Sequence, residues 1–264
     1  MALSSRVTVS LLALVAAAAA AQGAVLVWDH DNNQYFTDPE GNGKVGTEYA
    51  VTKALAANGV AGVSVATALP LDLSGYDAVF ILCGFWPNDG FISYYQLGEL
   101  EAYLERGGVL YLEGTDVARR YGTSAIFDYA GAAYADDGRP LDEGNVDVAQ
   151  GIGSLDGMTW DYASYRKEKP DGYVDELDVT TGEVVVRSRR AGNRTNARVA
   201  WRRNDTDPRF AVIVSTFIFG ALEDGANTKA ELMKAYLEFF GLAGPGDGGG
   251  PTPASLGRIR SLYR

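Results

Sequence analysis

The sequence predicts an α/β fold with a mostly parallel sheet and an antiparallel extension in its second half. Two observations support this prediction. In the first half, short apolar runs typical of buried strands alternate with amphipathic segments of helical period, which is the pattern of right-handed β–α–β crossovers. In the second half, three apolar runs are separated only by turn residues, which favours antiparallel neighbours. The 264 residues are enough for one large domain.

The first half is expected to contribute four strands, at residues 24–28, 62–69, 76–84 and 107–116. A helix is predicted over 47–59, with Thr47 as its N-cap and Gly59 as its stop signal. The segment 93–108 is predicted as a second amphipathic helix, because three leucines recur on one stripe and Gly107 follows as the C′ residue.

The second half is expected to contribute three sequential strands, at residues 183–190, 197–204 and 209–220. They are predicted to form the antiparallel extension or edge of the sheet. A last helix is expected over 227–241, with an apolar face turned inward. Residues 134–178 are rich in Asp and Gly and show no helical period, so no element is assigned there.

The first 21 residues have the layout of a secretory signal peptide. Arg6 supplies a positive charge, a short apolar run follows, and small residues precede a cleavage point before Gln22 or, alternatively, before Ala24. A membrane span needs about 20 strongly apolar residues, and neither this Ala-rich run nor any later segment meets that requirement. We therefore expect no transmembrane segment in the mature chain, and a secreted, periplasmic or cell-surface domain over residues 22–243.

Residues 244–264 combine a Gly/Pro linker with a basic, partly apolar nonapeptide. A linker of this composition does not pack into a core. The segment is either a frayed end or a tag that a sorting system reads after export.

Charge and cysteine content exclude some classes of function. The formal net charge is −11, and nucleic acids and anionic membranes need a basic footprint, so neither is expected as a partner. Cys83 is the only cysteine, so no intrachain disulfide can form.

Several segments together resemble one known superfamily. The runs "VLVWDHDNN", "YDAVFILCG", "LEAYLERGGVLYLEGTD" and "AELMKAYLEFF" are similar to the class I glutamine amidotransferase-like superfamily, which includes trehalose-utilisation-type domains and non-catalytic domains of secreted bacterial proteins. The resemblance covers roughly residues 24–242. It implies a flavodoxin-like three-layer α/β sandwich, in which the strands at 24–28 and 76–84 are neighbours.

The catalytic residues of that superfamily cannot be carried over. In its catalytic members, the strand after the "ERGG" helix ends in a nucleophilic Cys on a sharp turn, and a His–Glu pair follows the last core strand. The matching strand here ends at Glu113, the nearest hydroxyl is on Thr115, and no His follows the strand at 209–220. The turn matches the family pattern, but its catalytic residues are missing.

The turn after residue 112 nevertheless holds two candidate catalytic carboxylates, Glu113 and Asp116. Thr115 or Asp116 can cap the helix predicted at 116–122 by accepting its free N–H groups. Alternatively, burial at the strand end can raise the pKa of Glu113 and make it a general acid or base.

The only His and the only Cys form a second candidate. His30 and Cys83 each follow a strand end, and neighbouring strands could bring them together as a nucleophilic dyad. Alternatively, Cys83 is a packed thiol, and His30 forms a surface ion pair with Asp29 or Asp31.

The loop 29–43 is the candidate metal site. Its acids Asp29, Asp31 and Asp38 offer the hard oxygen ligands that calcium prefers, but the twelfth position counted from Asp38 is Tyr49 rather than the Glu of an EF-hand. The alternative is a turn, which this Asn/Asp/Gly/Pro composition favours. No other cofactor is expected.

Together these observations favour an exported, non-catalytic binding or accessory module at or outside the cell surface, with an unknown ligand. The alternative is a secreted hydrolase that uses the strand-end carboxylates or the His30–Cys83 pair. A structural cell-envelope role is a third possibility.

Overall fold

The computed structural model describes residues 24–137, 146–162, 174–188 and 196–242, and the predicted signal peptide and C-terminal tail lie outside these ranges. One nine-stranded sheet dominates the fold, in the order β4-β1-β5-β6-β13-β12-β11-β8-β9. Its strands are β1 (Val25–Asp29), β4 (Val63–Ala66), β5 (Ala78–Leu82), β6 (Val109–Glu113), β8 (Val148–Gly151), β9 (Thr159–Asp161), β11 (Glu183–Ser188), β12 (Ala197–Asn204) and β13 (Phe210–Ser215).

The first five strands of this order are parallel. Numbered along the chain, they lie in the order second, first, third, fourth, fifth, which is the flavodoxin-like order. The predicted flavodoxin-like α/β fold is therefore confirmed, and β1 and β5 are neighbours as expected.

The antiparallel extension consists of β12, β11, β8 and β9. The prediction that all three strands of residues 183–220 belong to it needs a correction. β13 pairs with β12 on one side, but on the other it runs parallel to β6, with Ala211 opposite Val109. It is a central strand, and its six residues are all buried.

The sequence pattern assigned no element to residues 134–178, but the structure contains strands there. Four short strands lie wholly or partly there: β8, β9, β7 (Ala132–Asp136) and β10 (Glu176–Val179), of which β7 and β10 form a separate antiparallel pair. Strands of three to five residues are too short for a clear period-two pattern, which explains why they were missed. A further two-stranded sheet joins β2 (Phe36–Thr37) and β3 (Lys44–Val45).

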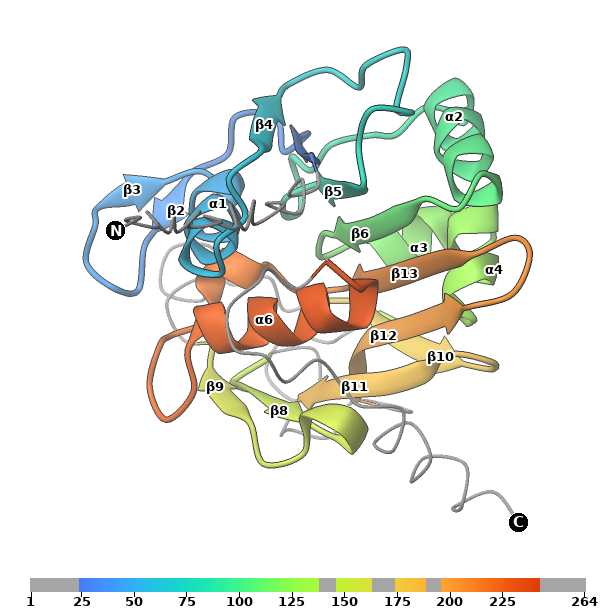
Figure 1. Cartoon of the computed structure of the whole chain (residues 1–264). Helices are drawn as coiled ribbons and strands as arrows, with labels where there is room; N and C mark the ends of the chain where they lie inside the picture. The colour runs from blue at the N-terminus through green and yellow to red at the C-terminus, as the bar shows by residue number, and fades with distance from the viewer. Residues whose placement is uncertain (1–23, 138–145, 163–173, 189–195, 243–264) are drawn as a thin grey trace, which may run out of the picture.

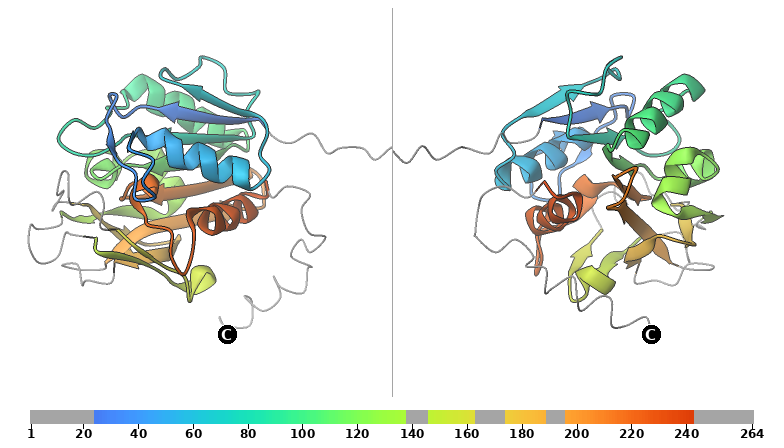
Figure 2. Two further views of the ribbon diagram at one scale, coloured as in Figure 1. Left: turned by 90° about the vertical axis from the view of Figure 1, so that its left-hand side faces the viewer. Right: turned by 45° about the vertical axis from the view of Figure 1, so that its right-hand side comes forward.

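Helices cover both faces of the sheet, as Figures 1 and 2 show. α1 (Thr47–Ala57) and α6 (Lys229–Phe240) pack on one face, and α2 (Tyr94–Glu105), α3 (Val117–Tyr121) and α4 (Ala125–Ala130) pack on the other. Side chains alternate between the two cores along β1, β5, β6 and β13: Val27 faces the α1–α6 core, whereas Leu26 faces the α2–α4 core. Two 3₁₀ turns complete the fold, η1 (Gly153–Leu155) and η2 (Phe219–Ala221).

Local sequence signals define the helix ends. α2 starts with a capping box between Ser93 and Gln96, and Gly107 follows it with φ 93°. Thr47, however, is not the N-cap of α1. It is the first helical residue, Gly46 is the N-cap, and the Thr47 hydroxyl donates to Asp31 at 2.8 Å. The residues in the described ranges contain no helix that is both long and apolar enough to cross a bilayer.

Candidate functional site

The loops and turns that follow β1, β5, β6 and β13 lie at one edge of the sheet, because the carboxyl ends of parallel strands meet there. All sequence-predicted site residues belong to this edge: Asp29, His30, Asp31, Asp38, Cys83, Glu113, Thr115 and Asp116. The turn after β6 is tied to the end of β5. Thr115 N donates to Gly84 O at 3.1 Å, and Trp86 N donates to Thr115 Oγ1 at 3.1 Å. A Cβ at Gly114 would lie 2.7 Å from Val117 Cγ1, so the turn requires glycine.

Glu113, the last residue of β6, is completely buried. Its Oε2 accepts hydrogen bonds from the Tyr111 hydroxyl at 2.6 Å and from Phe219 N at 3.0 Å. Its Oε1 has no hydrogen-bond partner within the described ranges. Burial raises the pKa of Glu113 to about 8, against the two hydrogen bonds, which lower it. The carboxyl group therefore fastens the end of β6 to η2 and does not face solvent.

The expected capping by Thr115 or Asp116 is wrong. Asp116 is the N-cap residue of α3 by position, but its side chain makes no capping hydrogen bond. Thr115 accepts from Trp86 instead. The backbone N–H of Arg119, in the first turn of α3, is bound by Asp175 at 2.8 Å. A carboxylate distant in sequence thus replaces the local cap.

Cys83 and His30 lie in different surroundings. Cys83 is completely buried in the α2–α4 core, and burial, with the charge of Asp89 in second place, raises the pKa of its thiol far above the ordinary value. The ring of His30 stacks on Trp28 with centroids 4.3 Å apart, and its Nε2 donates to Phe91 O at 2.9 Å. Within the described residues, no hydrogen bond or ion pair joins the Cys83 thiol to the His30 ring. The geometry gives no support to an activated thiolate.

Two of the three predicted metal ligands do lie together. Asp29, Asp31 and Glu48 each offer an oxygen atom within 4.8 Å of the others. Asp31 is occupied: it accepts from Gln34 N at 3.0 Å and from the Thr47 hydroxyl. Burial, followed by the charges of Asp31 and Glu48, raises the pKa of Asp29 to about 7. Glu48 was missed because it lies in the first turn of α1 rather than in the acidic loop. Helices that follow parallel strands nevertheless start at this edge.

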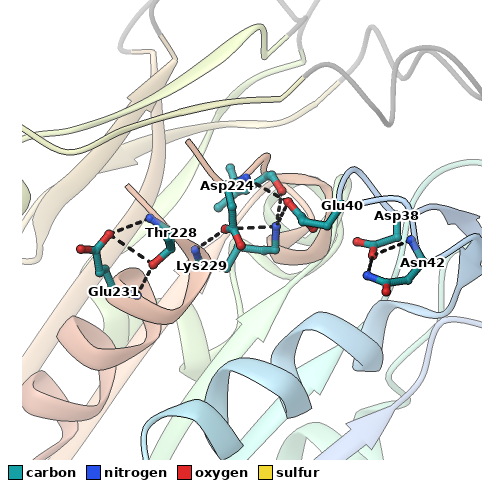
Figure 3. Close-up of polar contacts among 8 residues, drawn as sticks. Asp38, Glu40, Asn42, Asp224, Thr228, Lys229 and Glu231 are labelled. Carbon is teal, nitrogen blue, oxygen red and sulfur yellow. Dashed lines mark hydrogen bonds and ion pairs between the residues drawn. The ribbon is translucent and has the colours of Figure 1, made fainter. Parts of the chain in front are cut away.

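Asp38 lies apart from that group and forms a turn instead. It accepts from the backbone and side-chain nitrogens of Asn42. Glu40, two residues after Asp38, forms an ion pair with Lys229 Nζ at 2.6 Å (Figure 3). Lys229 Nζ also lies 3.3 Å from Asp224 Oδ1 and donates to Leu222 O at 2.7 Å. A pocket of about 120 Å³ adjoins this ion-pair cluster and the alanines of α1. Lys229 thereby holds the 38–43 turn against the start of α6.

Exposed aromatic side chains gather on the loops of the same edge. We call Tyr35, Trp86, Phe91, Tyr94 and Tyr95 the aromatic rim; they are 51–90% exposed. They come from the loop after β1, the loop after β5 and the first turn of α2. Gln34 joins the first two by exchanging hydrogen bonds with the backbone of Phe85 at 2.6 and 2.7 Å, and Asn32 donates to Asn88 O at 3.0 Å.

Comparison with known proteins identifies the fold but no family. No family model matches the chain, and no curated protein matches its sequence. Among solved structures, the N-terminal domain of mmIFT52 is similar over 85% of this chain and 98% of its own, with a TM-score of 0.50 and 14% identity. A catalytic mutant of Gan42B, a GH42 β-galactosidase from G. stearothermophilus, is similar with a TM-score of 0.53 and 13% identity over 86% of this chain. The chain spans 31% of that enzyme's length.

A ThuA-like protein from Bacteroides uniformis also matches, over 83% of this chain and 91% of its own, with a TM-score of 0.45 and 10% identity. The TM-scores of 0.50 and 0.53 show a shared fold, and identities of this size show nothing about activity.

Proposed function

We propose that this chain is an exported, non-catalytic binding module of the class I glutamine amidotransferase-like kind, and that the aromatic rim is its binding surface. The observation that carries the proposal is the exposure of five large aromatic side chains on hydrogen-bonded loops at the carboxyl edge. Exposed apolar patches of this kind on soluble proteins mark interaction sites. Ligands of open α/β sheets bind at this same edge.

The burial of the candidate nucleophiles supports a role without catalysis. Glu113 and Cys83 are both completely buried, so neither side chain is accessible to a substrate. The hydrogen bonds of Glu113 go to Tyr111 and Phe219, which gives its carboxyl group a structural use. These observations favour binding over chemistry at the turn after β6.

The chemistry of the rim favours a neutral polysaccharide as the ligand. Aromatic faces stack on the C–H faces of sugar rings, while tyrosine hydroxyls can hydrogen-bond to sugar hydroxyls. The net charge of −11 repels polyanions such as nucleic acids and acidic glycans. A neutral cell-surface polysaccharide meets both conditions and fits the export expected from residues 1–21.

Affinity electrophoresis tests this proposal. The protein should migrate more slowly in gels that contain at least one of three soluble neutral polysaccharides: a glucan, a mannan or a galactan. A Trp86→Ala/Tyr94→Ala variant should lose at least tenfold in affinity. Leu71→Ala is the matched control, because Leu71 is also exposed, at 85%, and belongs to the loop between β4 and β5 rather than to the aromatic rim. The proposal fails if no polysaccharide retards the protein, or if the control weakens binding equally.

One observation favours a hydrolase as the second candidate. A pKa of about 7 for Asp29 suits a general acid or base at neutral pH, and Asp29 Oδ1 accepts no hydrogen bond in the described structure. A screen with chromogenic esters and glycosides would reveal such activity. Turnover by the intact protein that Asp29→Asn abolishes, with the melting temperature unchanged, would favour the hydrolase over the binding module.

A further inference from the structure

Strand β4 forms one outer edge of the large sheet. It stands first in the strand order and, in the described part of the chain, pairs only with β1 (Figure 1). The pairing runs without a register shift from Val63 to Ala66. Ser64 and Val65 are exposed, Val65 at 51%. The outer side of β4 is therefore a regular strand that faces solvent.

The opposite edge of the sheet is covered by the chain itself. β9 ends the strand order there, and the loop after η2 runs along it. Glu223 N donates to Asp161 O at 2.8 Å, and Thr159 N donates to Asn227 Oδ1 at 2.9 Å. An edge strand is a template for pairing with another chain, and proteins protect such strands by covering them or by placing charges and prolines on them. β9 is protected by cover.

The sequence around β4 lacks the charges and prolines that protect an edge. Residues 60–69 contain no charged residue and no proline, although 22% of the chain is charged. Leu71, which follows shortly after, is an apolar side chain that is 85% exposed. An exposed, apolar and uncharged edge of this kind favours pairing with a further strand.

The pairing with β1 determines which backbone groups of β4 point outward. Val25 N donates to Gly62 O at 2.8 Å, so the backbone groups of Gly62 face β1. These groups alternate in direction along a strand, so those of Ser64 also face β1, whereas the N–H and C=O groups of Val63 and Val65 point away from it. Within the described ranges, no residue outside β1 forms a backbone hydrogen bond with Val63 or Val65.

This arrangement is self-complementary. In an antiparallel pair of two β4 strands with a two-fold axis at Ser64, Val63 of each copy lies opposite Val65 of the other. Residues paired in this way exchange both N–H···O bonds. A two-fold contact brings identical surfaces together, so a charged residue in β4 would meet a like charge. The uncharged β4 avoids this repulsion in a chain whose net charge is −11.

Other segments of this chain fit the edge less well than a second copy does. After the proposed cleavage before Gln22, residues 22–24 are all that precede β1, which leaves no length for a turn and a further strand. The C-terminal nonapeptide carries Arg258, Arg260 and Arg264, and the uncharged β4 offers these arginines no carboxylate. The charges therefore favour a second copy of the chain as the occupant.

We propose that β4 is a self-association surface, through which two copies of the chain join their large sheets into one continuous sheet. The surface includes no residue of the aromatic rim and does not depend on the proposed binding function. A strand of four residues is about 13 Å long, so the contact is smaller than the roughly 1,600 Å² of a standard stable interface. The dimer should therefore be weak and depend on protein concentration.

Sedimentation velocity of the mature chain, at concentrations from about 10 μM to about 1 mM, tests the proposal. We expect the parent protein to form a dimer as its concentration rises. Val65→Lys should weaken this dimer at least tenfold, because it brings two positive charges to the contact, even though it lowers the net negative charge of each copy. Thr159→Lys is the matched control. It makes the same charge change at an exposed position of β9, the covered edge, and should dimerise as the parent does.

Val65→Pro tests the hydrogen bonds and replaces Val65→Lys if that variant does not fold. Proline lacks the N–H group that Val65 directs away from β1, so the fold should tolerate it on this edge, while the dimer should be lost. A parent protein that stays monomeric at about 1 mM would overturn the proposal. So would a dimer that Val65→Lys leaves unchanged, or one that Thr159→Lys weakens equally. A dimer that appears only after deletion of residues 244–264 would assign β4 to the C-terminal tail instead.

Discussion

At the carboxyl edge, residues that the sequence suggested as catalytic or metal-binding form hydrogen bonds within the fold instead. The sequence resemblance predicted a nucleophile position on or next to Glu113, yet the carboxyl group of Glu113 binds Tyr111 and Phe219 inside the fold. Asp31, a candidate metal ligand, binds the first residue of α1. In both cases the residue type was recognised from the sequence, but its partners come from segments that only the folded chain brings close.

The Glu113 carboxyl group makes the stability of the fold depend on pH. Its folded pKa of about 8 lies above the ordinary value of 4.5. Between those values the folded state keeps a proton that the unfolded chain has lost. The contribution of this one group to the free energy of unfolding should therefore fall as pH rises from 5 to 8, by at most about 1.4 kcal/mol per pH unit, and level off above pH 8.

Glu113→Gln isolates this effect, because glutamine keeps an acceptor oxygen and does not titrate. Urea unfolding of both proteins at pH 5, 6.5 and 8 should show the variant gaining stability relative to the parent at each step. A difference that stays constant with pH would contradict the raised pKa.

The Cys83 thiol should not react in the folded protein. It is completely buried, and its raised pKa leaves almost no thiolate, which is the reactive form. At pH 8, a disulfide reagent such as DTNB should modify the native protein at least a hundredfold more slowly than the urea-unfolded protein. Fast native labelling would reopen the case for a nucleophilic cysteine.

At the scale of elements, a buried ion pair links the small sheet to the large one. Arg198, on β12, is fully buried, and its guanidinium donates to Val174 O at 2.7 Å and to Asp175 O at 2.9 Å. It also lies 3.5 Å from the buried carboxylate of Glu176, on β10. One side chain thus positions the start of β10.

Arg198→Met should therefore destabilise the protein strongly, by about 3–5 kcal/mol, because it removes the guanidinium that faces the buried Glu176 carboxylate. Urea unfolding measures the loss. Arg202→Met is the matched control on the same strand, where the guanidinium makes an exposed hydrogen bond to Asp128 O at 3.2 Å; its loss should stay below about 1 kcal/mol. Equal effects of the two variants would show that the ion pair is not what holds β10.

Elements with a strong local pattern could be predicted from the sequence, and those without one could not. α2 and α6 carry capping boxes and C-terminal glycines, which are signals within a few residues of each helix end. β13 was recognised as a strand, but its direction depends on pairing with β6, about a hundred residues earlier. β7 and β10 were missed altogether, and with them Asp137 and Asp175.

At the scale of the whole molecule, the parallel half of the sheet determines where polar groups accumulate. The parallel strands all end at the same edge of the sheet, which brings the loops after β1, β5 and β6 together there. Helices α1, α2, α3 and α6 also begin at this carboxyl edge. The following features therefore lie at the same edge of the sheet, although they are far apart in sequence: the aromatic rim, the Lys229 ion pairs, and the two clusters of three carboxylates (Asp29, Asp31 and Glu48; Asp116, Asp137 and Asp175).

Within the described ranges, the residues of the two cores on either side of the sheet run from Val25 to Leu242. α6 ends at Phe240, and Gly241 follows in the left-handed conformation that terminates helices. Deleting residues 244–264 removes none of the contacts described here, so the melting temperature should not change within experimental error.

In the native host, we expect the truncated protein to be exported but to accumulate in a different fraction, because the basic nonapeptide is proposed as a sorting tag. Fractionation of cells and medium measures this. A markedly lower melting temperature would mean that the tail stabilises the domain, and an unchanged distribution would refute the sorting role.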